Sequence, residues 1–301
     1  MIVWLNGALL PAGEARVSVF DRGFIFGDGV YEGLRWEGGR VLALGYHEER
    51  LRSGLVECRI VGFDAGRLGE VARAVVEANG LVEGAGFVYV QVTRGEPGAG
   101  EAVRSRVMGG GAEPTVFAYA EGIGSLASMD RCGERSVALV SDTRWTRGHV
   151  KGVSLLGNVI GAIEADEAGC DDAVFVRGGA GGGVGSGAVV SEGLATNVFA
   201  LVGGRVVTPS LESASMLGGV TRRVLVETLR EEGGDGAVEE RVLTVGELMG
   251  AEEVSLVGTR TAVSRVSSID GRAMGGVGLS GVLLGALKRG LLGGVDSGHD
   301  G

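Results

Sequence analysis

Lysine is almost absent from this chain of 301 residues: only Lys151 and Lys288 occur, although lysine and arginine together number 28. Cysteine is also scarce. Cys58, Cys132 and Cys170 are odd in number, far apart and in no metal-ligand spacing. This pattern argues against a disulfide framework and against a structural zinc site. We therefore expect three reduced, mostly buried thiols.

Long hydrophobic runs and excess positive charge are missing as well. No uninterrupted apolar run approaches the roughly 20 residues that span a bilayer, and the first fifteen residues lack a basic leader with a small-residue cleavage site. We therefore expect a cytoplasmic protein with no membrane partner. The formal net charge of −10 predicts no nucleic-acid partner, because a polyanion is bound by clustered cations.

Several catalytic signatures do not occur. Neither lysine follows the glycine of a GxxxxGK[ST] phosphate loop, and there is no GxSxG nucleophile elbow. His47, His149 and His299 lie far apart, and "HEERL" lacks the second histidine of a zinc-protease helix. No glycine motif between a strand and a helix is followed by the acidic residue of a dinucleotide site. These absences exclude a P-loop enzyme, remove support for α/β-hydrolase and metal chemistry, and disfavour an NAD site.

The composition predicts a folded protein with two domains. The chain is 45% hydrophobic and 22% charged, which suffices for a sizeable core, and its length favours two units of about 150 residues. Segments with strand and helix patterns alternate, which is typical of an α/β protein. We predict a small domain over 1–120, a polar linker over 121–135 and a larger mixed domain over 136–301. The glycine-rich run 178–187 is interpreted as a loop insertion.

Hydrophobic periodicity predicts the individual elements. In the first domain, 1–11 and 15–23 predict two short strands with a glycine turn, 30–44 a hairpin about Gly38 and Gly39, and 65–80 a helix; 86–95 and 114–121 predict further strands. The helix places one apolar face toward the core, made by Leu68, Val71, Ala72, Val75 and Val76.

In the second domain the same reasoning predicts alternating strands and helices. Strands are expected over 137–143, 172–176, 197–202 and 253–259, and helices from Ser154 to about Gly169, over 218–233 and over 281–292. This unit is the larger and more mixed of the two.

Lys151 raises the question of why a chain so rich in arginine retains a lysine. A lysine amine forms a Schiff base with a carbonyl, and pyridoxal phosphate chemistry needs such a lysine, a carboxylate at the pyridine nitrogen and donors for the phosphate. Glu192 precedes a strand in "SEGLATNVF", and the glycine-rich start of the helix at Val220 and Thr221 exposes backbone N–H groups. Thr259 follows another strand and is a second candidate phosphate contact.

Each of these features also has an ordinary explanation. Glu192 is compatible with a turn glutamate, the glycines before Val220 with simple helix capping, and Lys151 with a surface charge. The combination and its order along the chain carry more information than any single residue.

The quoted segments, taken together, resemble the class IV aminotransferases. This is the fold-type IV pyridoxal phosphate family of D-amino-acid, branched-chain and R-selective amine transaminases and aminodeoxychorismate lyase. The similar segments run in family order from about residue 3 to 272: "DRGFIFGDGVYEGLR" at 21–35, "HEERLRSG" at 47–54, "KGVSLLGN" from 151, "SEGLATNVF" from 191, "GGVTRRVL" from 218 and "GTRTAVSRVSSIDG" from 258. The resemblance implies a small N-terminal α/β domain and a larger, barrel-like mixed α/β domain.

The resemblance also implies roles for single residues. Lys151 would form the Schiff base with pyridoxal 5'-phosphate and then move a proton between substrate and cofactor. Glu192 would keep the pyridine nitrogen protonated, and Asn197 would support it or lie close to the ring. The remaining implied residues bind the phosphate or line the substrate pocket: Arg50, Gly219, Val220, Thr221 and Thr259 for the phosphate, Tyr31 for the pocket.

The substrate and the partners follow less directly. The resemblance implies an amino acid and a 2-oxo acid as substrates and a homodimer as the assembly. "YEGLR" favours the branched-chain group, whereas "FGDG" and "VTRG" favour D-amino-acid or R-amine enzymes. D-amino-acid transaminases carry an Arg-x-His pair shortly after "VTRG" that binds the substrate carboxylate, and this chain has none there. Arg260, beside Thr261, is hypothesised to bind that carboxylate instead.

Two alternatives remain open at this point. A lyase similar to aminodeoxychorismate lyase would use the same lysine and cofactor but would release pyruvate. A non-catalytic relative would keep the fold alone, although Lys151, Glu192 and Arg50 argue against it because each is needed for the cofactor or its chemistry.

Overall fold

The computed structural model describes residues 1–98, 100–107, 113–178 and 184–293. Residues 179–183 of the predicted glycine-rich loop lie outside these ranges. The chain divides into two compact units: one combines Met1–Leu126 with Val150–Leu155, and the other combines Ala127–His149 with the chain from Leu156 onward. Within the described ranges, no helix is both long enough and apolar enough to cross a membrane.

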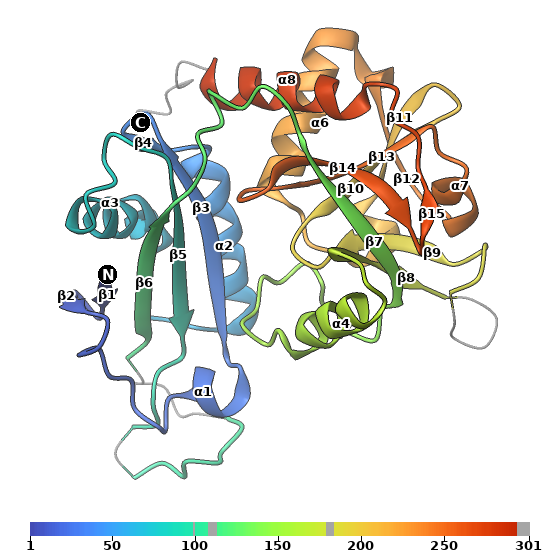
Figure 1. The fold of residues 1–301 in the computed structure, drawn as a ribbon. Coiled ribbons are helices and arrows are strands. Elements are labelled where there is room, and N and C mark those ends of the chain that lie inside the picture. The colour runs from blue at the N-terminus through green and yellow to red at the C-terminus, as the bar shows by residue number, and fades with distance from the viewer. Residues whose placement is uncertain (99, 108–112, 179–183, 294–301) are drawn as a thin grey trace. The chain divides into compact units, whose positions relative to one another are not determined.

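The first unit is built on an antiparallel sheet of six strands (Figure 1) in the order β2-β1-β6-β5-β3-β4. The strands are β1 Ile2–Leu5, β2 Ala8–Pro11, β3 Gly29–Glu37, β4 Arg40–Val41, β5 Gly86–Thr93 and β6 Thr115–Gly122. The helices are α1 Arg22–Phe26, α2 Leu44–Cys58 and α3 Leu68–Ala78, with the short 3-10 helix η1 Ala65–Arg67 before α3. The predicted hairpin about Gly38 and Gly39 is confirmed as β3 and β4.

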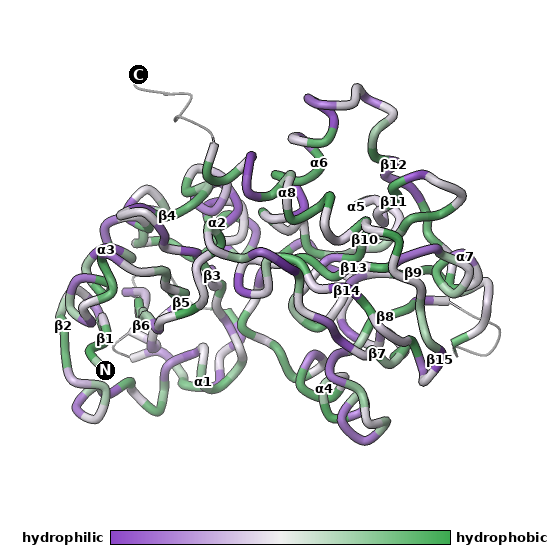
Figure 2. Tube along the Cα trace, turned by 45° about the horizontal axis from the view of Figure 1, so that its top comes forward, coloured by the Kyte–Doolittle hydropathy of each residue, from purple (hydrophilic) through white to green (hydrophobic). Residues whose placement is uncertain are grey.

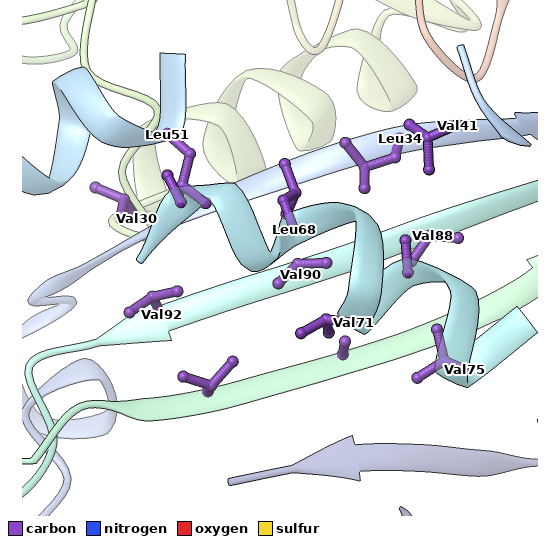
Figure 3. Close-up of a cluster of buried hydrophobic side chains, with 14 of the residues drawn as sticks. Val30, Leu34, Val41, Leu51, Leu68, Val71, Val75, Val88, Val90 and Val92 are labelled. Carbon is purple, nitrogen blue, oxygen red and sulfur yellow. The ribbon is translucent and has the colours of Figure 1, made fainter. Parts of the chain in front are cut away.

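Helices α2 and α3 pack on the sheet and bury its apolar side. The predicted apolar face of α3 is confirmed, since all five of its residues are buried. Figure 3 shows Leu68, Val71 and Val75 of this helix lying over Val88 and Val90 of β5. Alternation along β5 explains the match, because successive strand residues point to opposite faces.

The start of the chain differs from its prediction in one respect. The first eleven residues form the complete hairpin β1–β2, with Asn6 and Gly7 in the turn at positive φ angles of 49° and 92°. Residues 15–23 form no strand. Asp21 instead caps α1, its side chain accepting a hydrogen bond from the backbone N–H of Gly23 at 2.8 Å. An N-cap carboxylate favours a helix start over a strand at this position.

The second unit contains a mixed sheet of nine strands in the order β12-β11-β10-β13-β14-β7-β8-β9, with β15 paired to β14. The strands are β7 Gly133–Ser141, β8 Asp172–Arg177, β9 Val189–Gly193, β10 Asn197–Val202, β11 Arg205–Pro209, β12 Val238–Arg241, β13 Glu253–Gly258, β14 Ala262–Ile269 and β15 Arg272–Ala273. The end strand β9 contacts β10 and β11, so the sheet curls toward a half-barrel.

Helices lie on this curled sheet. They are α4 Leu156–Glu167, α5 Leu211–Ala214, α6 Val220–Gly233, α7 Val245–Met249 and α8 Leu279–Leu292, with the 3-10 helix η3 Asp235–Ala237. Helices α6 and α8 contact each other and β13, whereas α4 contacts β7 and β8. Strand β8, largely hydrophobic in Figure 2, serves two cores: Val174 and Val176 face one cluster, and Ala173 and Phe175 face the cluster under α4.

The structure places the lysine segment differently from the predicted domain boundaries. Residues 150–155 fall within the predicted range 136–301 but pack with the first unit. Backbone hydrogen bonds explain this placement: the N–H of Tyr31 donates to the carbonyl of Lys151 at 3.0 Å, and the N–H of Val153 donates to the carbonyl of Gly29 at 3.0 Å. The segment thus lies against the start of β3, on the side that does not pair with β5.

Candidate active site

Lys151 is held in the first unit by main-chain contacts on both sides. Gly152 pairs with Val30 in an isolated antiparallel bridge. Ser154 Oγ donates to the carbonyl of Gly27 at 2.9 Å. Gly27 has a positive φ of 66°, and a Cβ there would lie 2.3 Å from Ser154 Oγ. The glycine in "FGDG" therefore allows the lysine segment to approach β3 closely.

The side chain of Lys151 lies over an aromatic ring. Its Nζ is 4.1 Å from the centroid of Tyr31, a cation–π distance. Tyr31 is the first of a row of rings on one face of the sheet, with centroids 5.2 Å from Tyr31 to Tyr89 and 5.4 Å from Tyr89 to Tyr119. Burial, followed by the charges of these two neighbours, raises the pKa of Tyr89. The row orients the tyrosine that contacts the lysine.

Arg50 lies in a buried ion-pair cluster on the opposite face of β3, where Glu32 points toward α2. The Glu32 carboxylate accepts hydrogen bonds from Arg50 Nε at 2.7 Å and from Nη2 at 2.6 Å. His47 Nδ1 lies 2.7 Å from the same carboxylate. Glu32 is fully buried. One carboxylate therefore orients two polar residues of the "HEERL" segment, His47 and Arg50, which share a face of α2 at a spacing of three.

The protonation of this cluster follows from its charges. Burial alone would raise the pKa of Glu32, but Arg50 and then His47 outweigh it and lower that pKa to about 2. Burial lowers the pKa of His47, and the charges of Arg50 and Lys151 lower it further against the opposing effect of Glu32. The imidazole is therefore neutral at pH 7 and donates its Nδ1 proton to the ionised carboxylate.

Glu192 is part of a second buried cluster, in the other unit. It lies within β9 itself, whereas the sequence placed it between strand-like segments. Its Oε1 is 2.9 Å from Arg144 Nη1, and its Oε2 accepts the N–H of Leu217 at 3.2 Å. Asn197 Nδ2 donates to the carbonyl of Leu217 at 3.0 Å. Glu192 and Asn197 thus hold the same backbone residue, in keeping with a supporting role for the asparagine.

The start of α6 provides backbone donors beside this cluster. Gly219 is the N-cap, and none of the described side chains caps this end. A Cβ on Gly219 would lie 1.9 Å from Asn197 Oδ1, so the glycine is required for this close approach. Val220 and Thr221 are buried, and their N–H groups precede the first bond of the helix, which runs from Arg223 to Gly219. An uncapped helix start is a site for a small anion.

The turn 259–261 joins β13 to β14 near the same place. Strand register pairs Asn197 with Val257, so the turn follows directly after the level of Asn197. A Cβ on Gly258 would lie 3.1 Å from the carbonyl of Ala195. Thr259 and Thr261 are half-buried, and Arg260 is exposed. The sequence-predicted residues therefore fall into two groups, one in each unit.

Sequence reasoning did not identify five charged or polar residues of these clusters. Glu32 and His47 lie in the first unit. The other three lie in the second unit: Arg144, Asp142, which is 2.9 Å from Arg144 Nε, and Arg177, whose Nε is 2.7 Å from Asp142. A signal existed for the first two: Glu32 alternates with Val30 and Leu34 on the buried side of a strand, and His47 shares a helix face with Arg50. No comparable local pattern marks Arg144, which follows the end of β7.

The donors present suit pyridoxal phosphate. A lysine next to a tyrosine ring, a buried carboxylate fixed by an arginine, and a helix start without a side-chain cap are the three kinds of group that this cofactor needs. Gly219 and Gly27 leave space at the backbone where a side chain would collide with its neighbours.

Comparisons with known proteins agree with this chemistry. The family model for "Amino-transferase class IV" matches residues 29–269. The D-alanine aminotransferase of Bacillus licheniformis is 32% identical over 276 residues, covering 91% of this chain and 90% of that protein. The D-alanine aminotransferase of Staphylococcus haemolyticus is 30% identical over 279 residues, with 91% and 90% covered.

Solved structures share the fold. The branched-chain aminotransferase of Thermoproteus uzoniensis, solved with norvaline, has a TM-score of 0.78 and 27% identity, with 96% of this chain and 94% of that chain covered. A hypothetical aminotransferase from Mycobacterium tuberculosis in a PLP-bound form has a TM-score of 0.80, covers 97% and 99%, and at 21% identity is similar in fold. The predicted two-domain, mixed α/β fold with a barrel-like second domain is confirmed, and its sheet is a curled half-barrel.

Proposed function

Since the chain belongs to the class IV aminotransferases and is a pyridoxal phosphate-dependent transaminase, we propose that it transfers the amino group of a small D-amino acid to a 2-oxo acid. The observation that carries this choice is the 32% identity, over 91% of the chain, to a D-alanine aminotransferase. The segments "FGDG" and "VTRG" favour the same group.

Lys151 is the catalytic residue in this proposal. Pyridoxal phosphate, when bound, would supply the carbonyl for the substrate amine and an electron sink for the substrate α-carbon. The Lys151 amine takes the proton from the substrate α-carbon and delivers it to the cofactor carbon. Tyr31 orients the amine by contact with its ring at 4.1 Å and lines the substrate pocket.

The remaining residues hold the cofactor. Glu192 keeps a proton on the ring nitrogen, and Asn197 supports it through Leu217. The phosphate is bound by the guanidinium of Arg50 and by the donors at 219–221 and 259. Glu32 keeps Arg50 in place, and an arginine fork suits a phosphate better than a lysine would.

The substrate carboxylate needs a cation that differs from the usual Arg-x-His pair. Arg260, in the turn with Thr261, is the residue proposed for this contact. Replacing it in Arg260→Ala should raise KM for both the amino acid and the 2-oxo acid by about tenfold, since charge-assisted hydrogen bonds to a carboxylate contribute about 1.5–3 kcal/mol. An unchanged KM for both would remove Arg260 from the site.

Branched-chain L-amino acids are the second candidate substrates. "YEGLR" and the likeness to the T. uzoniensis branched-chain enzyme, with 27% identity and a TM-score of 0.78, favour them.

The proposal includes a cytoplasmic homodimer. Support comes from the first unit, where a hollow of about 380 Å³ is lined by side chains of β1, β5, β6 and residues 12–21, most of them apolar. The segment next to it exposes large apolar side chains: Val17 48%, Val19 66%, Phe20 50% and Phe24 77%. An apolar surface of this kind is typical of a self-complementary interface. Sedimentation equilibrium at micromolar concentration tests the dimer, and a monomer would contradict it.

A spectroscopic experiment separates the substrate candidates. The protein loaded with pyridoxal phosphate is mixed with D-alanine, L-alanine or L-leucine, without any 2-oxo acid, and its visible absorption is followed. Loss of the cofactor band with D-alanine alone is the expected result. Loss with L-leucine alone would support the branched-chain candidate and overturn the proposal. A lyase would release pyruvate from its own substrate without an acceptor, which lactate dehydrogenase detects.

A further inference from the structure

Arg144 binds both carboxylates of the buried cluster in the second unit. Its Nε is 2.9 Å from Asp142 Oδ1 and its Nη2 is 3.1 Å from Oδ2, which is a two-pronged ion pair. Its Nη1 points the other way and lies 2.9 Å from Glu192 Oε1. Glu192 therefore has one carboxylate oxygen bound to a guanidinium whose own position is set by Asp142.

Three further contacts leave the Arg144 side chain little freedom. The guanidinium carbon is 4.0 Å from the centroid of the Phe175 ring, which is buried in the core under α4. A Cβ on Gly157 would lie 2.7 Å from Arg144 Cγ, so α4 carries glycine where the side chain passes. The carboxylate of Asp142, fully buried, is also bound by Arg177 Nε at 2.7 Å. The arginine is fixed by a strand end, a ring and a helix.

The cluster is electrically balanced and charged throughout. Two carboxylates face two guanidiniums, and each is mostly shielded from water. Burial would lower the pKa of Arg144, but Asp142 and Glu192 raise it overall. Burial would raise the pKa of Asp142, and its two arginines lower it overall. If Asp142 needed only a countercharge, Arg177 would supply one, so the second arginine serves Glu192.

We infer that Arg144 is a positioning residue, which keeps the Glu192 carboxylate ionised and in one orientation for the ring nitrogen of pyridoxal phosphate. The inference rests on the proposed role of Glu192. Without Arg144, the buried carboxylate loses the guanidinium that lies 2.9 Å from its Oε1, and losing a nearby positive charge favours the protonated form. A protonated Glu192 would bind the ring nitrogen less tightly. This loss would grow as the pH falls, because more of the carboxylate is then protonated.

The test compares two arginines that bind the same aspartate. Arg144→Met removes the partner of Glu192, and Arg177→Met removes an arginine that binds only Asp142 among these carboxylates. Pyridoxal phosphate affinity is measured by fluorescence quenching from pH 6 to pH 8.5. We expect Arg144→Met to weaken binding about tenfold or more at pH 7.5, the effect of losing a supporting contact behind a ligand, with a loss that grows toward pH 6. Arg177→Met should stay within about threefold of the wild type.

A double-mutant cycle distinguishes positioning from a purely structural role. If Arg144 acts through Glu192, then adding Arg144→Met to Glu192→Gln changes the affinity by less than about twofold. A structural loss would instead add in full in that background. Arg144→Lys restores the charge but not the two-sided fork, so it should recover the flat pH profile while binding more weakly than the wild type. If Arg144→Met does not fold, Arg144→Lys takes its place in the comparison with Arg177→Met.

Two results would overturn the inference. One is equal affinity and equal pH dependence in Arg144→Met and Arg177→Met; the other is full additivity in the cycle. Failure of the proposed role of Glu192 looks different, because Glu192→Gln by itself would then leave the affinity for pyridoxal phosphate unchanged.

Discussion

The two units use the same ion pair in opposite ways. In the first unit a buried carboxylate, Glu32, holds an arginine, Arg50, whose guanidinium is proposed to bind a phosphate. In the second unit a buried arginine, Arg144, holds a carboxylate, Glu192, that is proposed to bind a ring nitrogen. In each case the residue proposed to bind the cofactor is fixed by a partner of opposite charge.

The difference between the clusters lies in how they are closed. Glu32 is shared between Arg50 and the neutral His47, both from α2, so one helix supplies every partner. The Arg144 cluster takes its members from the residues just after β7, from β8 and from β9. The first cluster therefore forms when one helix packs on β3. The second cluster forms only when β7, β8 and β9 lie side by side in the sheet.

Removing Lys151 should have the largest effect, because the proposed chemistry depends on its amine and neither ion-pair cluster supplies another. Lys151→Ala should lower turnover by about 10⁴-fold or more, as expected for the loss of a nucleophile that works as a unit with its site. The control is Lys288→Ala, which removes the only other lysine; its Nζ donates to the carbonyl of Ala127. Full activity in Lys151→Ala would contradict the mechanism, and the melting temperature shows whether each variant is folded.

Glu32→Gln breaks the first cluster while keeping its shape. Arg50 is then buried beside a neutral amide, and a broken buried pair costs about 3 kcal/mol. Urea unfolding of the cofactor-free protein measures the loss. The matched control is Glu70→Gln, which removes an exposed partner of Arg67 in the same unit and should have little effect. Equal losses in the two variants would mean that burial of the pair is unimportant.

Glu253→Gln tests whether a buried carboxylate needs a cation at all. Glu253 is fully buried and accepts the backbone N–H groups at the start of α8, from Val277, Gly278, Leu279 and Ser280. These donors lower its pKa against the opposing effect of burial. Gln would lose the charge and one acceptor oxygen, and we expect a cost of about 2 kcal/mol.

The control for this variant lies on the surface of the same unit. Glu227→Gln removes an exposed i,i+4 partner of Arg223 on α6, and it should leave the urea midpoint nearly unchanged. A midpoint for Glu253→Gln that matched this control would show that the N–H groups of α8 find other partners.

The smallest expected effect is a pH slope set by His47. Its pKa is lowered from 6.5 in the folded protein, so the unfolded chain binds the proton first and stability falls as the pH drops below 6.5. Glu32 acts at lower pH: its pKa of about 2 lies below 4.5, so its contribution is present above pH 4.5 and is lost from there toward pH 2.

Urea unfolding at pH 7.5 and pH 5.5 isolates the histidine. The wild type should lose about 1 kcal/mol between these values, and His47→Asn should lose less of its own stability over the same range. His149→Asn, which changes an exposed histidine, should keep the wild-type slope. A slope unchanged by His47→Asn would mean that this imidazole is not buried in its neutral form.

Local patterns predicted many of the elements, although not the structure of residues 15–23, and they did not predict the clusters. The apolar face of α3 and the hairpin about Gly38 depend on residues close in sequence, so periodicity and turn glycines suffice for them. The place of Lys151 depends on a bridge between Val30 and Gly152, which are separated by most of the first unit and by β7. Arg144 meets Glu192 because β9 lies beside β8 in the curled sheet. Such pairs arise from strand order, which no local period encodes.

The proposed division of labour between the two arginines has a direct test. Affinities for pyridoxal phosphate and for pyridoxal, which lacks the phosphate, are measured for the wild type, Arg50→Met and Arg144→Met. We expect Arg50→Met to weaken binding of pyridoxal phosphate alone, and Arg144→Met to weaken both ligands by the same factor. If both variants changed the ratio of the two affinities equally, the two clusters would not serve different parts of the cofactor, and the account would be wrong.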